Sequence, residues 1–254
     1  MFRVIRARIQ QGHRTMKYPD GPPPVLPERF RGMPSVDSIR CVDGCNRCEA
    51  ACPASAIRKA ESVRLDMGRC LFCGDCSREC ATGAIRFGGD HRLSARRREA
   101  LVVDGTDHRI IEQADASVHR MFGRSLKLRQ VSAGGCNACE ADANVLTTLA
   151  WDLGRFGIQF VASPRHADGL LVTGPVTENM KLAMEKTYAA VPSPRIVIAS
   201  GACAISGGPY REHPEVHNGA AEVLPVDLFV PGCPPHPLTL LEALLVFLGR
   251  IPRE

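Results

Sequence analysis

Twelve cysteines form three groups of four, and their spacing indicates redox chemistry. Two groups are short runs, and the third is spread over the second half of the chain. The groups are Cys41, Cys45, Cys48 and Cys52; Cys70, Cys73, Cys76 and Cys80; and Cys136, Cys139, Cys203 and Cys233. A cubane iron-sulfur cluster binds four cysteine thiolates. The count therefore predicts three 4Fe-4S clusters in a chain that moves electrons one at a time.

The two short runs match the bacterial two-cluster pattern, in which three cysteines bind one cluster and the fourth reaches the other. The predicted ligands are Cys41, Cys45, Cys48 and Cys80 for one cluster, and Cys52, Cys70, Cys73 and Cys76 for its partner. The first run has an extra residue after Cys41, and Ala81 replaces the usual proline after Cys80. Neither change removes a ligand. Structural zinc is the alternative, although zinc quartets usually come as separated pairs.

The third set is weaker by spacing alone, but its members share a setting. Cys136 and Cys139 lie between a strand-like and a helix-like segment, and Cys203 and Cys233 each follow a strand-like segment. The carboxyl ends of parallel strands are where open α/β sheets build their sites. From the spacing, a zinc site or inert buried thiols remain open for this set.

Strand-like and helix-like segments alternate from residue 126 onward. Predicted strands cover 126–131, 158–162, 169–173, 195–200 and 222–230, and predicted helices cover 140–156, 178–190 and 238–248. This alternation predicts a parallel sheet with helices on both faces.

Several segments of this second half carry a family resemblance. They are Ser132 to Glu140, Ser163 to Asp168, Gly174 to Thr177, Gly201 to Cys203 with Gly207-Gly208, and Pro231 to Pro235. Together they resemble the small, cluster-bearing subunit of group 4 membrane-bound nickel-iron hydrogenases of the formate hydrogenlyase type, homologous to the 20 kDa subunit of respiratory complex I. The resemblance covers about Leu126 to the C-terminus. It implies that the third cysteine set ligates the cluster nearest the active site, which disfavours zinc there.

The first half resembles the ferredoxin-like subunit of the same complexes, related to the 23 kDa subunit of complex I. The segments that carry this resemblance are Tyr18-Pro19, Pro27 to Gly32, the two cysteine runs, and Leu93 to Val103. Two polypeptides that are usually separate are therefore expected to be joined here. We predict an α+β two-domain chain, with a bacterial-type two-cluster ferredoxin fold followed by a flavodoxin-like α/β domain with a parallel sheet.

The expected division has four parts. They are a basic, proline-rich extension at 1–36, a ferredoxin-like domain with two clusters at 37–90, a connector at 91–125, and an α/β domain with one cluster at 126–254.

Composition excludes several classes of protein. The 254 residues are 44% apolar and 23% charged, as in ordinary globular proteins, and only 5% are aromatic, which argues against base stacking on nucleic acid. No apolar run reaches the roughly 18 residues that span a bilayer. Met1 to Gln11 lacks the apolar core of a signal peptide. We expect a protein bound peripherally to the cytoplasmic side of the membrane, where thiols stay reduced.

The N-terminus carries the excess of positive charge. The first forty residues hold eight basic and three acidic side chains, which equals the net charge of +5 of the whole chain. Phe2, Ile5 and Ile9 recur at helical spacing. A basic amphipathic helix on a membrane or in a partner's groove is one interpretation, and a frayed terminus is the other.

Catalytic residues are not expected in this chain. No dinucleotide, P-loop or zinc-protease motif occurs, and no cysteine is left for nickel, so neither nickel, flavin nor NAD is predicted. Glu140 follows a predicted ligand at the start of a helix, where the helix dipole stabilises a carboxylate. Both a structural role and a proton relay remain open for Glu140.

The resulting hypothesis is a non-catalytic electron-transfer subunit of an oxidoreductase. By resemblance, its partners are a nickel-iron large subunit, a membrane arm related to antiporters, and a formate dehydrogenase or a ferredoxin. A nickel-free complex I-like quinone or ferredoxin oxidoreductase is the alternative. A free-standing electron carrier, the third hypothesis, predicts a polar surface around Cys136 instead of an apolar patch.

Overall fold

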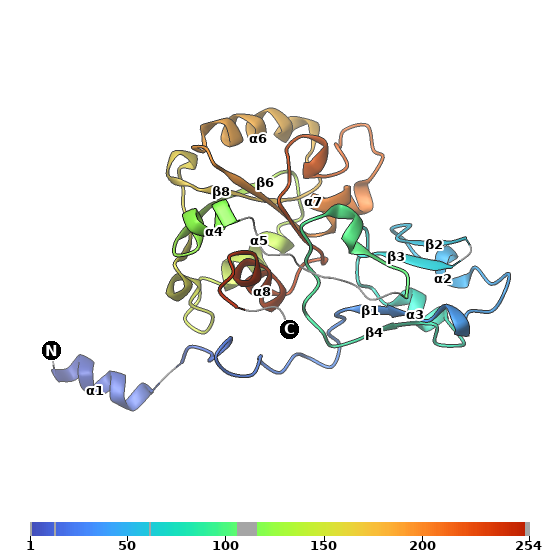
Figure 1. Ribbon diagram of the computed structural model, residues 1–254, viewed down its shortest axis with the longest axis horizontal. Coiled ribbons are helices and arrows are strands. Elements are labelled where there is room, and N and C mark those ends of the chain that lie inside the picture. The colour runs from blue at the N-terminus through green and yellow to red at the C-terminus, as the bar shows by residue number, and fades with distance from the viewer. Residues whose placement is uncertain (1, 13, 61, 106–115, 252–254) are drawn as a thin grey trace.

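Short apolar segments form a five-stranded parallel sheet in the second half of the chain (Figure 1). The computed structural model describes residues 2–12, 14–60, 62–105 and 116–251. The strands of this sheet are β6 (Leu126–Ser132), β7 (Ile158–Phe160), β8 (Gly169–Thr173), β9 (Ile196–Ser200) and β10 (Leu228–Val230). Every residue of β8, β9 and β10 is buried, as expected for parallel strands covered on both faces.

The strand order β10-β9-β8-β6-β7 is that of flavodoxin-like sheets, which confirms the predicted fold class. The strand order reverses between β6 and β8, so the chain leaves these two neighbouring strands toward opposite sides of the sheet. Gly135 and Gly174 lie in the loops that follow β6 and β8, and a Cβ on Gly174 would come within 2.5 Å of the Gly135 nitrogen. The glycines therefore allow the two loops to touch at the reversal point.

Helices cover the two faces of the sheet. One face packs against α5 (Ala138–Val145) and α8 (Pro237–Phe247), and the other against α6 (Glu178–Ala190) and α7 (Ala202–Ser206). Every residue of α8 is buried, because this helix is apolar on nearly all sides. The short helix α4 (Ala116–Phe122) precedes β6.

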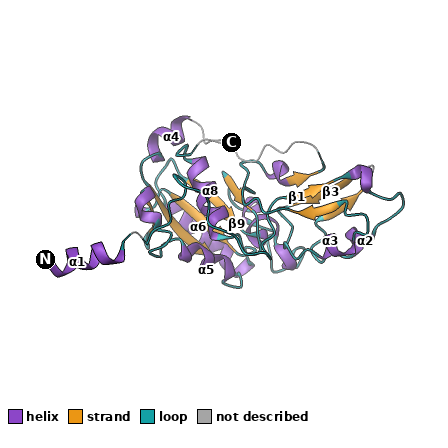
Figure 2. Cartoon of the chain, turned by 90° about the horizontal axis from the view of Figure 1, so that it is seen from below, coloured by secondary structure: helices purple, strands orange, loops and turns teal. Residues whose placement is uncertain are grey.

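The first half forms small antiparallel sheets around two short helices. β1 (Pro34–Val36) pairs with β4 (Ile85–Phe87), and β3 (Val63–Asp66) pairs with both β2 (Ile57–Lys59) and β5 (Val102–Val103). Helices α2 (Arg47–Ala50) and α3 (Asp75–Glu79) lie side by side at the end of the molecule opposite α1 (Phe2–Gln11) (Figure 2). This arrangement is the predicted ferredoxin-type fold.

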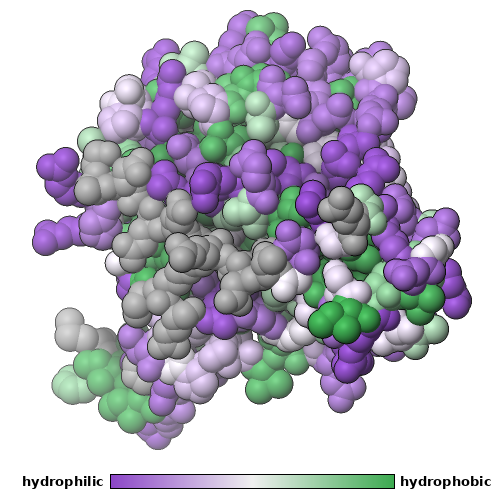
Figure 3. Space-filling model, turned by 45° about the vertical axis from the view of Figure 1, so that its right-hand side comes forward, coloured by the Kyte–Doolittle hydropathy of each residue, from purple (hydrophilic) through white to green (hydrophobic). Residues whose placement is uncertain are grey.

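One hydrophobic core joins the two halves. It contains Ile57 and Leu65 from the first half and Val172 and Phe229 from the second half. Polar and charged side chains cover most of the face shown in Figure 3, with apolar residues in small separate groups. Short 3-10 helices cover Ser38–Arg40, Arg98–Leu101, Leu153–Phe156, Pro164–His166, Gly208–Tyr210 and Ala220–Glu222.

The N-terminal helix α1 forms as its apolar spacing predicts, but none of its residues is buried. It projects from the body of the molecule in Figure 1. The chain that follows is tied to the second half, because Arg155 donates hydrogen bonds to the carbonyl oxygens of Met16 and Tyr18, both at 2.6 Å.

Two predicted elements are too long. The predicted helix 140–156 is wrong beyond Val145, where α5 ends and a turn leads to the 3-10 helix Leu153–Phe156. The hydroxyls of Thr147 and Thr148 bond to backbone carbonyls at 2.8 and 2.7 Å, a local competition that helix patterns do not reveal. The predicted strand 222–230 shrinks to β10 because its first part folds as a 3-10 helix and turn.

Candidate metal centres

The cysteines of the first run surround the start of α2. Cys41 and Cys45 lie in the preceding loop, Cys48 lies inside α2, and Cys52 follows the helix. Lys59 holds this loop from β2, because its Nζ donates to the backbone oxygen of Cys45 at 2.9 Å and to that of Val42 at 2.7 Å. Burial raises the pKa of the Cys48 thiol, and Cys41 and Cys80 add to the shift. The fourth cysteine of the second run therefore lies beside the first run.

The cysteines of the second run gather around α3. Burial raises the pKa of Cys70 to about 12, with smaller contributions from Cys76, Cys52 and Cys73. The same four thiols line one apolar cavity. The fourth cysteine of the first run, Cys52, thus lies among the thiols of the second run.

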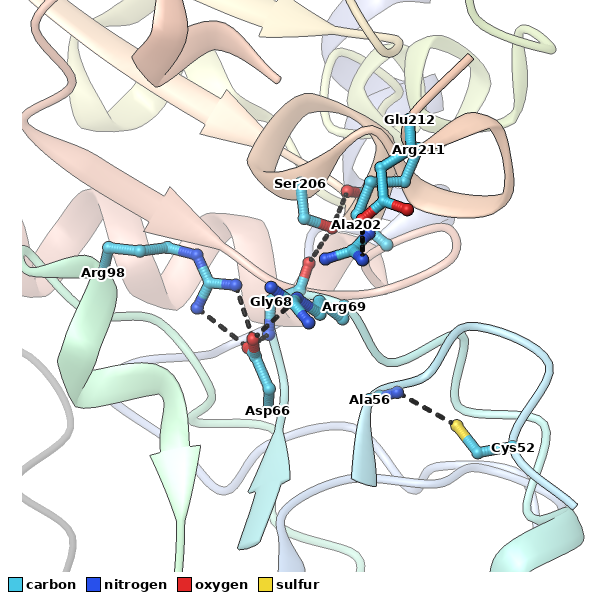
Figure 4. A network of polar contacts seen from close by, with 10 residues as sticks. All are labelled: Cys52, Ala56, Asp66, Gly68, Arg69, Arg98, Ala202, Ser206, Arg211 and Glu212. Carbon is cyan, nitrogen blue, oxygen red and sulfur yellow. Dashed lines mark hydrogen bonds and ion pairs between the residues drawn. The ribbon is translucent and has the colours of Figure 1, made fainter. Parts of the chain in front are cut away.

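Backbone amides point at two of the sulfurs in equivalent positions. The N–H of Ala56 donates to Cys52 Sγ, and the N–H of Ala84 donates to Cys80 Sγ, both at 3.2 Å. Figure 4 shows the first of these contacts. Burial works to raise the pKa of Cys80, but hydrogen bonds from nearby backbone and hydroxyl groups lower it overall. Such donors stabilise anionic sulfur, so these positions suit thiolate ligands.

The third set comes together at the carboxyl edge of the parallel sheet. Cys136 and Cys139 lie at the β6–α5 junction, Cys203 lies in α7 after β9, and Cys233 follows β10. Burial raises the pKa of Cys139 well above its usual range, and Cys203, Glu140, Cys233 and Cys136 add to this shift. Strands distant in sequence therefore bring four thiols within electrostatic reach of one another.

Two glycines leave room for this third set. A Cβ on Gly201 would come within 2.5 Å of Cys139 Sγ, and one on Gly208 within 2.7 Å of Cys203 Sγ. Both glycines have positive φ, at 93° and 56°, which side-chain-bearing residues rarely adopt. The side chains of Cys136 and Cys233 are exposed, whereas Cys139 and Cys203 are partly buried. The set therefore opens toward the surface on one side.

Glu140 is buried beneath the third set, with 6% of its surface exposed. Thr173 Oγ1 on β8 donates to Glu140 Oε1 at 2.6 Å. Burial works to raise the pKa of this carboxyl, but hydrogen bonds from Ser132 and Thr173 lower it overall. Glu140 thus fastens the start of α5 to β6 and β8.

The donor sets fit iron-sulfur clusters by their chemistry. They consist of thiols, many of them desolvated, and clustered thiols of raised pKa release protons when a metal binds. A cubane spreads four thiolates over four irons, whereas zinc draws its ligands to one point.

Sequence patterns did not reveal a polar network that joins the two halves. Asp66, Gly68, Arg98 and Ser206 meet beside the second and third cysteine sets (Figure 4). These residues belong to no motif and lie far apart in sequence. Their only signal is that Asp66 and Gly68 shortly precede Cys70, and that Ser206 shortly follows Cys203.

Comparisons with known proteins match both halves of the chain. Residues 136–247 match the family model of the NADH ubiquinone oxidoreductase 20 Kd subunit, and residues 40–84 match the 4Fe-4S dicluster domain. A probable membrane-bound hydrogenase subunit of Pyrococcus furiosus is 37% identical over 150 residues, which is 59% of this chain and 90% of that protein.

Two further relatives match over half or more of the chain. Formate hydrogenlyase subunit 7 of Escherichia coli is 36% identical over 64% of both chains. A subunit of the NADH-quinone oxidoreductase of a Roseiflexus species is 47% identical over 51% of this chain and 48% of that protein. These matches confirm the family resemblance seen in the sequence. The chain therefore belongs to the family of 20 kDa-type iron-sulfur subunits that occur in membrane-bound hydrogenases, formate hydrogenlyases and NADH-quinone oxidoreductases.

Proposed function

We propose that this chain relays single electrons through three 4Fe-4S clusters to or from the catalytic large subunit of a membrane-associated nickel-iron hydrogenase complex. The observation that carries the proposal is the convergence of the third cysteine set, whose four thiols come from separate strands and helices of the sheet. When bound, a 4Fe-4S cluster accepts and donates one electron at a time. The chain itself holds, spaces and shields the clusters.

The proposed ligand sets follow the observed proximities of the thiols. They are Cys41, Cys45, Cys48 and Cys80; Cys52, Cys70, Cys73 and Cys76; and Cys136, Cys139, Cys203 and Cys233. The crossed positions of Cys52 and Cys80 support the first two sets, and the room left by Gly201 supports the third.

The order of the three sites along the molecule supports a linear relay. Cys48 of the first set contributes to the raised pKa of Cys76 in the second, so these two sets are neighbours. Leu71 and Phe72, which follow Cys70, line the same hollow as Cys233 of the third set. The second set therefore lies between the other two.

The third set marks the face on which we place the large subunit. Cys136 and Cys233 are exposed, so a bound cluster there lies near the surface. A partner that covers this face would exclude water and bring its own redox centre close. For Glu140 we propose the structural role, because its hydrogen bonds join α5 to β8 and lower its pKa.

We propose the same division of the chain as its sequence suggests: an extension at 1–36, a ferredoxin-like domain at 37–90, a connector at 91–125 and an α/β domain at 126–254. The five-stranded parallel sheet lies wholly within 126–254 and supports the last boundary. The end of the extension, β1, and part of the connector, β5, pair with strands of the ferredoxin-like domain. Residues 106–115 of the connector lie outside the described residues.

We place the complex on the cytoplasmic side of a membrane, with an antiporter-like arm as a further partner and a formate dehydrogenase or a ferredoxin as redox partner. The similarity to a probable membrane-bound hydrogenase subunit supports membrane association. Across the described ranges, the structure contains no helix with the length and apolarity needed to span a bilayer.

A nickel-free complex I-like oxidoreductase is the second candidate function. The 47% identity to a subunit of an NADH-quinone oxidoreductase favours it. The assignment of nickel depends on the large subunit, because this chain has no cysteine beyond the twelve proposed ligands. Nickel in the purified complex supports the hydrogenase, and a complex with full iron but no nickel supports this second candidate.

Metal and sulfide analysis of the anaerobically purified complex tests the relay itself. We expect about twelve irons and twelve sulfides in this chain. Electron paramagnetic resonance of the reduced protein should show interacting cluster signals. Four or eight irons would remove one or two of the proposed sites. A colourless protein that carries zinc would contradict the proposal as a whole.

A further inference from the structure

Arg98 and Asp66 form a two-point ion pair beside the second cysteine set. Arg98 Nη1 donates to Asp66 Oδ1 at 2.8 Å, and Nη2 donates to Oδ2 at 2.6 Å (Figure 4). Only 26% and 19% of the two side chains are exposed, so water screens the pair weakly. The backbone oxygen of Asp66 accepts the N–H of Cys70 at 3.0 Å. The ion pair therefore orients the residue that anchors Cys70.

Gly68 connects this ion pair to the helix that carries Cys203. Asp66 Oδ1 accepts the N–H of Gly68 at 2.9 Å. The Ser206 hydroxyl shares its hydrogen between the Gly68 oxygen at 2.9 Å and the Ala202 oxygen of its own helix at 3.0 Å. Ser206 is the last residue of α7, three residues after Cys203. A chain of hydrogen bonds thus runs from the loop of the second set to the helix of the third.

Gly68 lies in a narrow gap between side chains of Arg98 and Ile205. A Cβ at this position would lie 2.7 Å from Arg98 Cζ and 2.8 Å from Ile205 Cγ2. Because both neighbours belong to the closely packed contact between the halves, the backbone of the second-set loop lies directly against α7. A side chain at this position would have to displace the Arg98 guanidinium, which breaks its ion pair with Asp66, or move the loop away from α7.

Arg98 is itself fastened to the strand that leads to Cys233. Ala95 pairs with Phe229 of β10, with N–H to oxygen distances of 3.0 and 2.8 Å in the two directions. Arg98 follows three residues later, at the start of a 3-10 helix. The same network therefore ties the second-set loop to both the Cys203 helix and the Cys233 strand.

We propose that Asp66, Gly68, Arg98 and Ser206 are positioning residues that set the distance between the second and third cluster sites. The inference rests on the proposed function. Electron transfer through protein slows as the distance between redox centres grows, so a wider gap between the two sites lowers the rate of the hop. We call the contact between the Gly68 loop and α7 the seam. A close contact at the seam keeps the hop between the sites short.

Three substitutions in the full chain, purified anaerobically in its complex, test this inference. Gly68→Ala crowds the side chains of Arg98 and Ile205, Arg98→Lys keeps the charge but loses the two-point geometry, and Ser206→Ala removes one hydroxyl. The matched control is Arg155→Ala. Arg155 also joins distant segments of the chain, but its hydrogen bonds go to Met16 and Tyr18 and not to the cysteine loops. The readouts are iron content, the magnetic interaction between reduced clusters, and hydrogen exchange at residues 66–70 and 201–206.

We expect the Gly68 and Arg98 variants to keep about twelve irons but to show a weakened magnetic interaction between the second and third sites and slower electron equilibration between them. Ser206→Ala should weaken the magnetic interaction and slow electron equilibration by less. Arg155→Ala should leave both quantities unchanged. Amide exchange should rise on both sides of the seam in the first three variants.

A magnetic interaction unchanged in all three seam variants would overturn the inference, even with a lowered melting temperature, because that result indicates a purely structural role. If Gly68→Ala loses iron, the magnetic interaction in Ser206→Ala and Arg98→Lys decides the question: an unchanged interaction in both overturns the inference. The unsubstituted chain separates the two proposals: without clusters the proposed function fails, whereas with full clusters and insensitive variants only the positioning role fails.

Discussion

The two halves of the molecule assemble their cysteine sites in opposite ways. In the first half, six of the eight cysteines lie with neighbours from their own run, within or next to helices of four and five residues. In the second half, one site draws on residues that follow β6, β9 and β10. The first half has little regular structure of its own, whereas the second half has a sheet with a buried helix on one face.

This difference implies that cluster binding contributes differently to the stability of the two halves. Elements as short as α2 and α3 are marginal without an external constraint, so in the first half the clusters are expected to supply much of the stability. The parallel sheet buries strands and α8 extensively, so in the second half the fold is expected to exist first and to present its thiols to the cluster. We therefore expect metal to complete the fold of the first half and to occupy a preformed site in the second half.

Removal of iron should break this comparison most visibly. Chelation under reducing, anaerobic conditions should lower the amide protection of residues 40–87 to that of an unfolded chain, because their short elements lose their crosslinks. The five strands of the second half should stay protected. Hydrogen-exchange mass spectrometry measures both regions in one sample. Equal loss or equal retention in the two halves would refute the distinction.

A matched pair of glycine substitutions sharpens the comparison between the cysteine sites of the two halves. In Gly201→Ala, the new Cβ would lie 2.5 Å from Cys139 Sγ, so the third site should be lost and iron should fall from about twelve to about eight per chain. In Gly44→Ala, nothing lies within 4 Å of the new Cβ, so only backbone strain of about 1 kcal/mol is added. Iron analysis compares them; equal iron in both variants would contradict the crowding argument.

Loss of the hydroxyl that supports Glu140 should have an intermediate effect. Thr173→Val keeps the side-chain shape but removes a 2.6 Å hydrogen bond to a buried carboxylate, so the second half should lose about 2 kcal/mol of stability. Thr187→Val, at a half-buried position of α6 whose hydroxyl bonds to the Ala183 oxygen of the same helix, should change it by less than about 0.5 kcal/mol. Melting curves of the two variants test the difference, and similar curves would argue against a structural role of Glu140.

The exposed ion pair between the short helices should matter least. Arg47 Nη2 lies 2.8 Å from Glu79 Oε2, but 58% and 48% of the two side chains are exposed. Arg47→Ala should therefore lower the stability of the first half by no more than about 1 kcal/mol. Chemical denaturation with the clusters in place measures this. A loss as large as that of Thr173→Val would show that charge contributes more to the first half than its exposure suggests.

Local patterns were sufficient for much of the fold. The alternation of apolar strands and helices predicted the parallel sheet, and α6 covers the predicted residues 178–190. The prediction failed after Val145, where threonine hydroxyls compete for backbone carbonyls, and before β10, where pairing covers only three residues. Hydrophobic periodicity records which side of an element is buried, but it is insensitive to such local hydrogen bonds.

The twelve cysteines, the prediction that their two runs cross and the family resemblance came from the sequence, because ligand chemistry needs particular residue types at spacings that short loops impose. The strand order, the convergence of Cys136, Cys139, Cys203 and Cys233, and the contact of Gly68 with α7 were decided only by the tertiary structure. The residues that form these features are separated by long stretches of chain. No local spacing encodes how a sheet orders its strands or how two domains pack against each other.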